Sequence, residues 1–313
     1  MYTYIVNRIL ATIPVMGVVA IFVFLLLHLT PGDPAAVIAG DYARPEDIIR
    51  IRAKLGLDQP IYVQFGTWLG SLLNGDLGIS IFSNLPVTKL IGQRLEPTLA
   101  LTTTTLIVAI VLAVPIGVLA AWKAGTWIDR VVMIFAVLGF SIPVFVLGYM
   151  LMYGFAVQLK WFPVQGYVSI GEGFLPFLRS LTLPSVALGV IYMALIARIT
   201  RASVLEVLAE DYIRTAHAKG LSSQQVLSRH ALKNAAVPIV TIIGIGVALL
   251  IGGVVVTESV FNIPGLGRLT VDAILHRDYP IIQGIILIFS AVYVLVNLLV
   301  DIAYTFLDPR IRY

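Results

Sequence analysis

Long apolar runs alternate with polar segments along most of the chain. Six runs, each holding at most one charged residue, occupy residues 9–29, 98–121, 131–159, 181–199, 237–256 and 283–306. At a rise of about 1.5 Å per helical residue, each run can cross the roughly 30 Å of hydrocarbon in a bilayer. The pattern predicts an all-α membrane protein with six transmembrane helices. An even number of spans places both termini on one side of the membrane.

The polar stretch between the first two runs, residues 30–96, is the longest in the chain. Pro45, followed by two acidic residues, predicts the start of a short amphipathic helix. Aromatic and apolar residues within 60–72 predict a second helix lying at the membrane interface. The first apolar run is longer than the core of a signal peptide, about 7–15 residues, so we expect it to remain as a transmembrane helix.

Lys and Arg are distributed unevenly between the two sides of the membrane. The side of the termini carries Arg8, Lys123, Arg130, Arg198, Arg201, Arg214, Lys219, Arg229, Lys233, Arg310 and Arg312, whereas the short loops opposite carry only Lys160, Arg179, Arg268 and Arg277. Long loops do not count toward the positive-inside rule, so 30–96 is left out. We therefore predict cytoplasmic termini and three regions: an N-terminal transmembrane helix (1–29), an external loop with amphipathic helices (30–96) and a transmembrane core (97–313).

A second polar segment, residues 202–237, separates the fourth and fifth runs. Gly220 is placed to end one helix in the left-handed conformation. Ser222, with Gln225 three residues later, forms a capping box that starts another helix. The segment is rich in Lys and Arg and also carries apolar side chains. It predicts a cytoplasmic helical hairpin, which is either a solvated positive loop or an element that docks into a groove of a soluble partner.

The hairpin also carries a family resemblance. The sequence RTAHAKG at 214–220, followed by RHALKN at 229–234 and by Pro238, resembles the cytoplasmic "EAA" coupling loop of binding-protein-dependent ABC importer permeases. The variant in the dipeptide and oligopeptide subfamily is the closest likeness. Ala216 and Gly220 match the general pattern, whereas Arg214 stands where that pattern opens with Glu. Further motifs in loop 30–96 and in 258–268 resemble the external loops of the same subfamily.

This resemblance implies the type I ABC importer permease architecture, with a long external first loop and a cytoplasmic coupling helix. It also implies two groups of functional residues. The group that couples to an ATPase is Asp211, Tyr212, Arg214, Thr215, Ala216, Ala218, Lys219, Gly220 and Leu221. The group at the external gate or on the substrate path is Glu258, Phe261, Asn262, Arg268 and Asp278. Glu258 either meets the amino group of a peptide or anchors its loop by pairing with Arg268 or Arg277.

The resemblance further implies a set of partners. They are a second homologous permease subunit, two cytoplasmic ATPase subunits, and a periplasmic or extracellular solute-binding protein that delivers a peptide substrate. No G-x-x-x-x-G-K-[ST] sequence occurs in the chain, so ATP and Mg are expected on the partner ATPases and no cofactor is expected on this chain. The expected location is the bacterial cytoplasmic (inner) membrane, with several spans in the lipid bilayer.

Composition limits the other functional classes. Hydrophobic residues make up 59% of the chain and charged residues only 12%, whereas soluble domains are about 45–50% apolar. A net charge of +4 in such a chain is no evidence for a nucleic-acid partner. The chain has no cysteine, and no two of its four histidines are spaced as metal ligands on a helix face. We therefore expect no enzyme activity and no metal site.

Three alternatives remain at this point. Similar permeases carry glutathione or metal chelates as well as peptides. An ion-coupled secondary transporter is a different class, which is expected to show inverted repeats that the sequence does not display. An intramembrane serine protease requires a Ser/His arrangement at membrane depth, and none is evident.

Two features inside the apolar runs complete the prediction. Small residues recur every four positions at Ala109, Ala113, Gly117 and Ala121. Such a stripe lets a second helix approach closely, either within this chain or from another subunit. Asp301 lies inside the last run, about one turn from its cytoplasmic end, where its side chain is expected to reach the interface.

Overall fold

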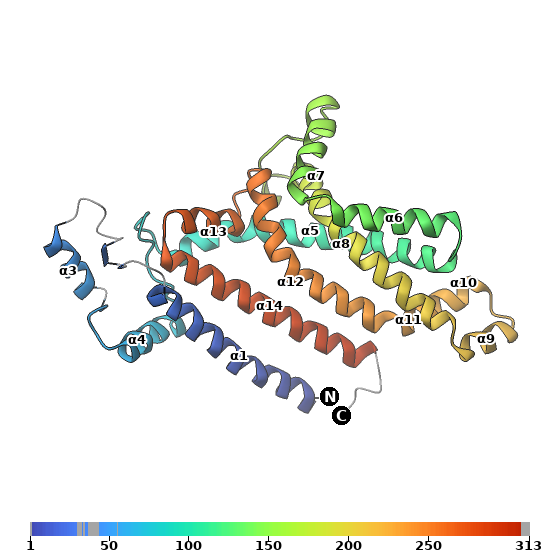
Figure 1. Ribbon diagram of the computed structural model, residues 1–313, viewed down its shortest axis with the longest axis horizontal. Helices are drawn as coiled ribbons and strands as arrows, with labels where there is room; N and C mark the ends of the chain where they lie inside the picture. The colour runs from blue at the N-terminus through green and yellow to red at the C-terminus, as the bar shows by residue number, and fades with distance from the viewer. Residues whose placement is uncertain (1, 30–32, 34, 37–43, 55, 308–313) are drawn as a thin grey trace.

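The computed structural model describes residues 2–29, 33, 35–36, 44–54 and 56–307 (Figure 1). Within these residues, five helices are long and apolar enough to cross a membrane. They are α1 (Tyr2–Leu29), α5 (Val87–Trp122), α8 (Phe174–Leu208), α12 (Ala236–Val260) and α14 (Tyr279–Leu307). A bent pair, α6 (Trp127–Ser141) with the segment Val144–Gln158, brings the number to six when it is counted as one span. The all-α fold with six spans is confirmed.

The third span differs from the continuous helix expected over 131–159. Helix α6 ends at Ser141, and α7 (Val144–Leu151) continues at an angle of 104°. The break lies at Ile142 and Pro143, because proline disfavours helical geometry in the residue before it, and Ile142 is extended with φ −90° and ψ 121°. A π-helix, η1 (Met152–Gln158), completes the span. Figure 1 shows α7 turning away from the direction of α6.

Helix α8 is the central element of the fold. In its most apolar window 72% of the residues are buried, compared with 33% or less in the other four long helices. It packs against α5, α6 and α12. The small-residue stripe of α5 is buried, and a Cβ atom on Gly117 would lie 2.6 Å from the carbonyl oxygen of Ala197 and 2.7 Å from Cβ of Thr200. The stripe therefore serves packing within this chain, where only glycine fits between α5 and α8.

Helix α1 lies at the edge of the bundle and packs along α14 (Figure 1). The side chain of Gln283 donates a hydrogen bond to the carbonyl oxygen of Val23 at 3.1 Å. The predicted helices of the first loop are present as α3 (Pro45–Lys54) and α4 (Ile61–Leu73). Both lie beyond the end of α1 that is opposite the N-terminus, with α4 touching α1.

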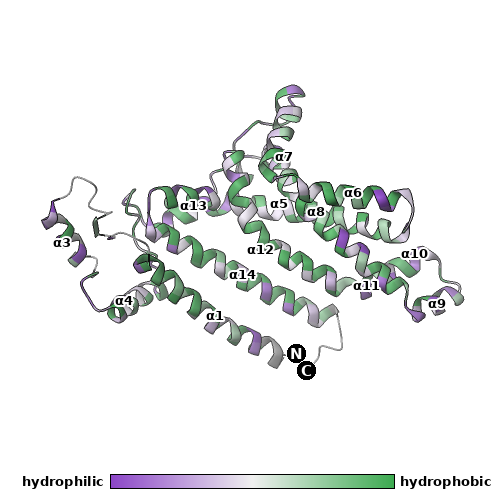
Figure 2. Ribbon diagram, in the orientation of Figure 1, coloured by the Kyte–Doolittle hydropathy of each residue, from purple (hydrophilic) through white to green (hydrophobic). Residues whose placement is uncertain are grey.

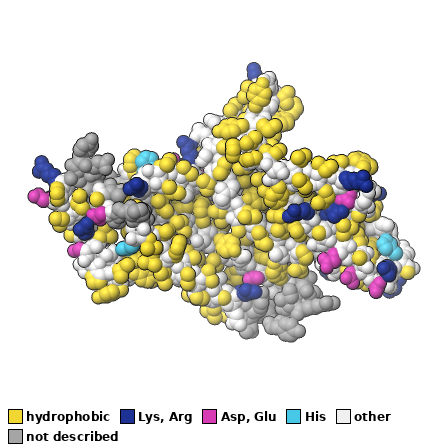
Figure 3. Space-filling model, in the orientation of Figure 1, with side chains coloured by type: hydrophobic (Ala, Val, Ile, Leu, Met, Phe, Trp, Pro, Cys, Tyr) yellow, Lys and Arg dark blue, Asp and Glu magenta, His cyan; other side chains and the backbone are white. Residues whose placement is uncertain are grey.

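Hydropathy follows this arrangement. Hydrophobic residues dominate the long helices, whereas hydrophilic residues gather on α3 and on the short helices beyond the end of α8 (Figure 2). On the face shown in Figure 3, charged side chains lie mostly toward the two ends of the long axis. The apolar middle is the part that a bilayer would surround. Arg310 and Arg312, counted above for orientation, lie outside the described residues.

Candidate functional site

The polar segment after α8 folds as a helical hairpin. Its first limb is α9 (Asp211–Ala218), and its second limb runs through α10 (Ser223–Gln225), the π-helix η3 (Val226–Ala231) and α11 (Leu232–Asn234). Gly220 has φ +85°, the left-handed conformation predicted for the turn. The Ser222 side chain accepts a hydrogen bond from the backbone N–H of Gln225, whose own side chain accepts one from the N–H of Ser222. Both turn predictions are confirmed.

Helix α9 has a buried face and an exposed face. Ile213 and Ala216 are 3% and 7% exposed and pack with Val226 of the second limb and with Val207 and Leu208 at the end of α8. Leu221 is half-buried beside them. These contacts hold α9 against both α8 and the second limb. Of the predicted coupling residues, Ala216 and Leu221 therefore lie inside the hairpin.

The remaining predicted coupling residues lie on the surface: Asp211, Tyr212, Arg214, Thr215, Ala218, Lys219 and Gly220. Asp211 and Arg214 form an ion pair at 3.3 Å, with side chains that are 94% and 79% exposed. The hydroxyl oxygen of Tyr212 accepts a hydrogen bond from the Asn234 amide at 2.9 Å, which ties α9 to α11. The hairpin thus presents one continuous polar face to the solvent.

The second limb connects the hairpin to three spans. Ala231 and Ala235 are almost fully buried, and they pack in one cluster with Ala121 of α5, Val204 of α8 and Ile239 of α12. Small side chains at these positions let the limb lie close to the ends of the spans. The second limb therefore contacts α5, α8 and α12 directly.

An ion pair not predicted from the sequence fixes the turn between α5 and α6. Asp129 is 5% exposed and accepts hydrogen bonds from Nε and Nη2 of Arg201 at 2.5 and 2.7 Å. Its carboxylate also accepts the backbone N–H of Gly125 at 3.0 Å. Arg201 belongs to α8, about two turns before the hairpin. In the sequence, the only indication of this ion pair is that Asp129 stands alone near the start of an apolar run. Its partner could not be identified because it lies 72 residues away.

At the opposite end of the bundle, Glu258 is fully buried at the end of α12. Its carboxylate accepts hydrogen bonds from the Thr98 hydroxyl at 2.5 Å and from the backbone N–H of Arg268 at 3.0 Å. Thr98 in turn accepts the N–H of Leu266 at 2.7 Å. A Cβ atom on Gly265 would overlap the carboxylate. This geometry favours the anchoring role of Glu258, with a hydroxyl and a backbone N–H as partners in place of the arginine side chains that we had considered.

The other predicted gate residues divide into buried and surface positions. Phe261 is 2% exposed, and its carbonyl oxygen accepts the N–H of Gly166 at 2.9 Å. Asn262 lies at the surface with φ +53°, and its side-chain oxygen accepts a hydrogen bond from the Arg268 guanidinium. Only Asn262 and the partly exposed Arg268 are therefore placed to contact a molecule outside the chain.

Asp278, the fifth of these residues, holds the first loop against the last one. It lies between α13 (Leu266–Leu275) and α14 and is 1% exposed. Its carboxylate accepts the Ser80 hydroxyl at 2.5 Å and the backbone N–H groups of Ile81 and Phe82 at 3.2 Å each. Two segments almost 200 residues apart are joined in this way.

A third contact at this end of the bundle joins the start of α5 to the loop before α8. Glu96 accepts hydrogen bonds from the hydroxyls of Tyr167 at 2.9 Å and Ser169 at 2.6 Å. Burial, followed by the hydrogen bond to Glu96, raises the pKa of the Tyr167 hydroxyl above its usual range, so it remains a donor. The loops at this end of the bundle are therefore tied to one another by carboxylate contacts.

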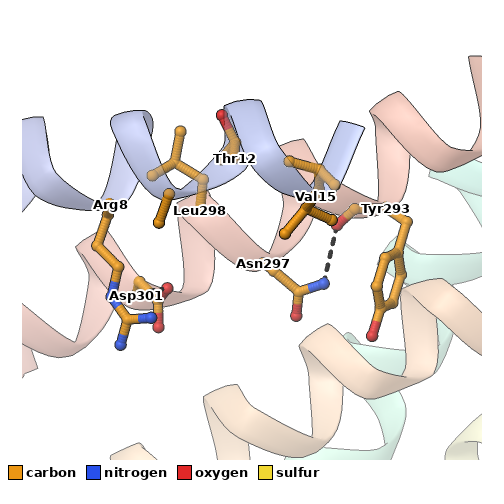
Figure 4. A pocket seen from close by; sticks show the side chains of 9 residues that line it. Arg8, Thr12, Val15, Tyr293, Asn297, Leu298 and Asp301 are labelled. Atoms are coloured by element: carbon orange, nitrogen blue, oxygen red, sulfur yellow. Dashed lines mark hydrogen bonds and ion pairs between the residues drawn. The ribbon is translucent and has the colours of Figure 1, made fainter. Parts of the chain in front are cut away.

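Polar side chains also lie between α1 and α14, around a cavity of about 240 Å³ (Figure 4). Asp301 forms an ion pair with Arg8 at 3.3 Å, and the Asn297 amide donates to the carbonyl oxygen of Tyr293 at 3.0 Å. The Asp301 side chain is 22% exposed. It thus has a partner on the neighbouring helix, which the sequence did not identify. Among the described residues, no group of three or more His, Asp or Glu side chains is arranged to hold a metal ion.

Six apolar helical spans and a hairpin that continues the central span are the architecture of an integral membrane protein. The chain belongs to the family described as "Binding-protein-dependent transport system inner membrane component", which matches residues 113–313. The family for the N-terminal part of such components matches residues 1–102. The resemblance seen in the coupling loop is thereby confirmed over nearly the whole chain.

Relatives match over the whole length. A probable peptide ABC transporter permease protein of Sinorhizobium fredii is 56% identical over 100% of both chains. A putative peptide transport system permease protein of Brucella abortus is 48% identical, and a glutathione transport system permease protein of Escherichia coli is 45% identical, both over 100% of each chain. A chain of the inward-facing MetNI methionine ABC transporter has a TM-score of 0.57 at 20% identity, covering 70% of this chain and 96% of that one. That likeness supports the fold.

Gly220→Val is expected to leave the protein in the membrane but to abolish most of its transport. A residue other than glycine in the left-handed region costs about 1–2 kcal/mol, and a β-branched side chain fits there worst. Gly220→Asn is the matched control, because asparagine tolerates this conformation. Uptake of cargo, normalised to the amount of this chain in the membrane, measures the effect. Undiminished uptake by the valine variant would show that the turn does not need a left-handed residue.

Arg201→Gln is expected to lower the free energy of unfolding in detergent by about 2 kcal/mol, because it leaves the buried Asp129 carboxylate without its charged donor. Arg214→Gln is the control, since its ion pair is exposed and such pairs contribute little. The double exchange Asp129→Arg with Arg201→Asp is expected to recover part of the loss. Equal effects of the two glutamine variants would contradict the structural importance of the buried pair.

Proposed function

We propose that this chain forms half of the translocation pathway of an ATP-driven importer of dipeptides or oligopeptides. The observation that carries the proposal is the relationship at 56% identity, over the full length of both chains, to a probable peptide ABC transporter permease protein. A second permease subunit of the same kind supplies the other half. A solute-binding protein outside the membrane delivers the peptide, and two ATPase subunits in the cytoplasm bind ATP and Mg.

The exposed face of α9 is the proposed contact with an ATPase subunit. Its polar side chains make few contacts within the chain, whereas Ile213 and Ala216 on the opposite face hold the helix to α8. An amphipathic helix of this kind suits a groove on a soluble partner. Because the second limb packs on α5, α8 and α12, closure of the ATPases is passed to the spans.

This arrangement requires the hairpin to lie in the cytoplasm. The excess of Lys and Arg on the side of the hairpin and the termini supports that orientation in the inner membrane. The loop 30–96 then lies outside, where Asp278 holds part of it against the last loop. Asn262 and Arg268 lie on the same external side and are the proposed gate residues that reach the surface.

Glutathione is the second candidate cargo. It is itself a small peptide, and a glutathione transport system permease protein is 45% identical over the full length. Peptides other than glutathione are favoured as the cargo, because several relatives with higher identity are described as peptide permeases.

Uptake of a labelled tripeptide into right-side-out membrane vesicles, with the solute-binding protein added outside, tests the proposal. Wild-type uptake is expected to require internal ATP and to survive a protonophore, with little competition from glutathione. Thr215→Trp, which adds bulk to the exposed face of α9, is expected to abolish ATP-dependent uptake at unchanged membrane level. Ser223→Trp on the second limb, also exposed, is the control.

Each alternative has its own outcome in this experiment. Uptake that persists without ATP and collapses with the protonophore would identify an ion-coupled transporter. Strong competition by glutathione would replace the proposed cargo with glutathione. Normal uptake by the Thr215→Trp variant would remove α9 as the ATPase contact.

A further inference from the structure

A cavity between α6 and α8 contains an arginine without a carboxylate partner in the described part of the chain. The cavity has a volume of about 200 Å³ and is lined by Ala136, Val137, Phe140, Ser141, Ala194 and Arg198. The guanidinium carbon of Arg198 lies 5.8 Å from the centre of the Phe140 ring. The ion pairs found among the described residues do not include Arg198, whose side chain is exposed.

The position of this arginine along α8 places it one turn deeper in the bundle than Arg201. Arg201, one turn nearer the hairpin, is level with the turn between α5 and α6, because it pairs with the carboxylate there. Further toward the membrane centre, Gly139 of α6 faces Ala194, whose Cβ would lie 3.3 Å from a Cβ on that glycine. Arg198 lies between these two levels, and its side chain reaches back to Phe140 at the deeper one.

The direction of the side chain determines which anion it can meet. Helical side chains lean toward the N-terminus of their helix, and the N-terminal end of α8 is the external one. Arg198 therefore points away from the cytoplasmic headgroups, whereas an arginine near the end of a span normally extends toward them. A charged side chain at membrane depth is costly and typically faces a water-filled path or a partner of opposite charge. A phospholipid phosphate in the cytoplasmic leaflet lies in the wrong direction.

We propose that the Arg198 cavity binds the C-terminal carboxylate of the peptide during its passage. The inference rests on the proposed import of peptides, and it assigns the surface between α6 and α8 to the pathway. A guanidinium holds a carboxylate through two parallel hydrogen bonds. Every linear peptide with a free C-terminus carries this group whatever its side chains are, so the contact is independent of peptide sequence.

The size of the cavity agrees with a transient contact to one end of the peptide. Sites that enclose a whole small molecule measure about 300–1,000 Å³, which is more than this cavity provides. It accommodates the carboxylate and part of the last residue, while the rest of the peptide stays in the pathway. Selection among peptides then belongs to the solute-binding protein, and Arg198 affects the rate of passage.

The test uses the complete transporter, with all its subunits, in liposomes. Two labelled tripeptides are compared that differ only in a C-terminal carboxylate or carboxamide and bind the solute-binding protein equally well. Arg198→Gln is expected to lower the maximal uptake rate of the carboxylate peptide about tenfold, since hydrogen bonds to a charged group are lost. The rate for the amide is expected to stay within about twofold. Arg198→Lys is expected to fall between wild type and Arg198→Gln.

Arg130→Gln is the matched control, because Arg130 is an exposed arginine of α6 outside the cavity. It is expected to leave both rates unchanged. Undiminished carboxylate uptake in Arg198→Gln overturns the inference, and so does an equal loss for both peptides, which would indicate a general role in packing.

Two further outcomes would show that Arg198 contacts something other than the peptide carboxylate. Loss of the second permease from purified Arg198→Gln complex, detected by mass spectrometry, would assign Arg198 to a subunit interface. Loss of a bound phospholipid, at an unchanged ratio of the two uptake rates, would make the cavity a lipid site. If the wild-type transporter carries neither peptide, the proposed cargo class is wrong as well. If it carries both and Arg198→Gln leaves the ratio unchanged, only the inference fails.

Discussion

The close approach of α5 to α8 is the constraint on which the other elements depend. Lipid tails are as apolar as the side chains, so helices in a bilayer associate through tight packing between small residues. Gly117 leaves no room for a Cβ atom between α5 and α8, and the alanines that precede it on α5 are buried in the same way. The central span is thereby fixed, and α6 and α12 pack around it. Because α8 runs on into the hairpin, the candidate coupling element extends directly from the most buried span.

Carboxylates fix the polar segments at both ends of the bundle, but with different partners. On the side of the hairpin, Asp129 meets a guanidinium in a bidentate pair. On the opposite side, Glu258 and Asp278 accept hydrogen bonds from hydroxyls and backbone N–H groups. Each of these contacts satisfies donors that a buried loop would otherwise leave unpaired. The loops at the end opposite the hairpin are therefore held by hydroxyl and backbone donors, whereas the turn between α5 and α6 is fixed to α8 by charge.

Sequence patterns predicted the elements that depend on local chemistry. The six spans follow from uncharged length, and the hairpin follows from Gly220 and the capping box at Ser222, which require only neighbouring residues. The break at Pro143 was within reach of the same reasoning, but the apolar run around it was long enough to predict one helix. The hydrogen-bond partners of Asp129 and Glu258 could not be predicted in this way. They lie far away in the chain, and the residues next to each carboxylate do not indicate which donor it will meet. The position of Arg198 beside Phe140 depends on how α6 packs on α8, which hydrophobic periodicity does not predict.

The central claim is our proposal that the hairpin moves together with the spans on whose ends it packs, α5, α8 and α12. The chain contains no cysteine, so two introduced cysteines can be spin-labelled without background. Pulsed electron paramagnetic resonance would measure the distance between labels at Ala218 on α9 and Lys123 in the turn, both exposed. In the assembled transporter, the account predicts the same distance distribution without nucleotide and with bound ATP. A distribution that shifts or broadens with ATP would show that the hairpin moves independently of the spans and would contradict the account.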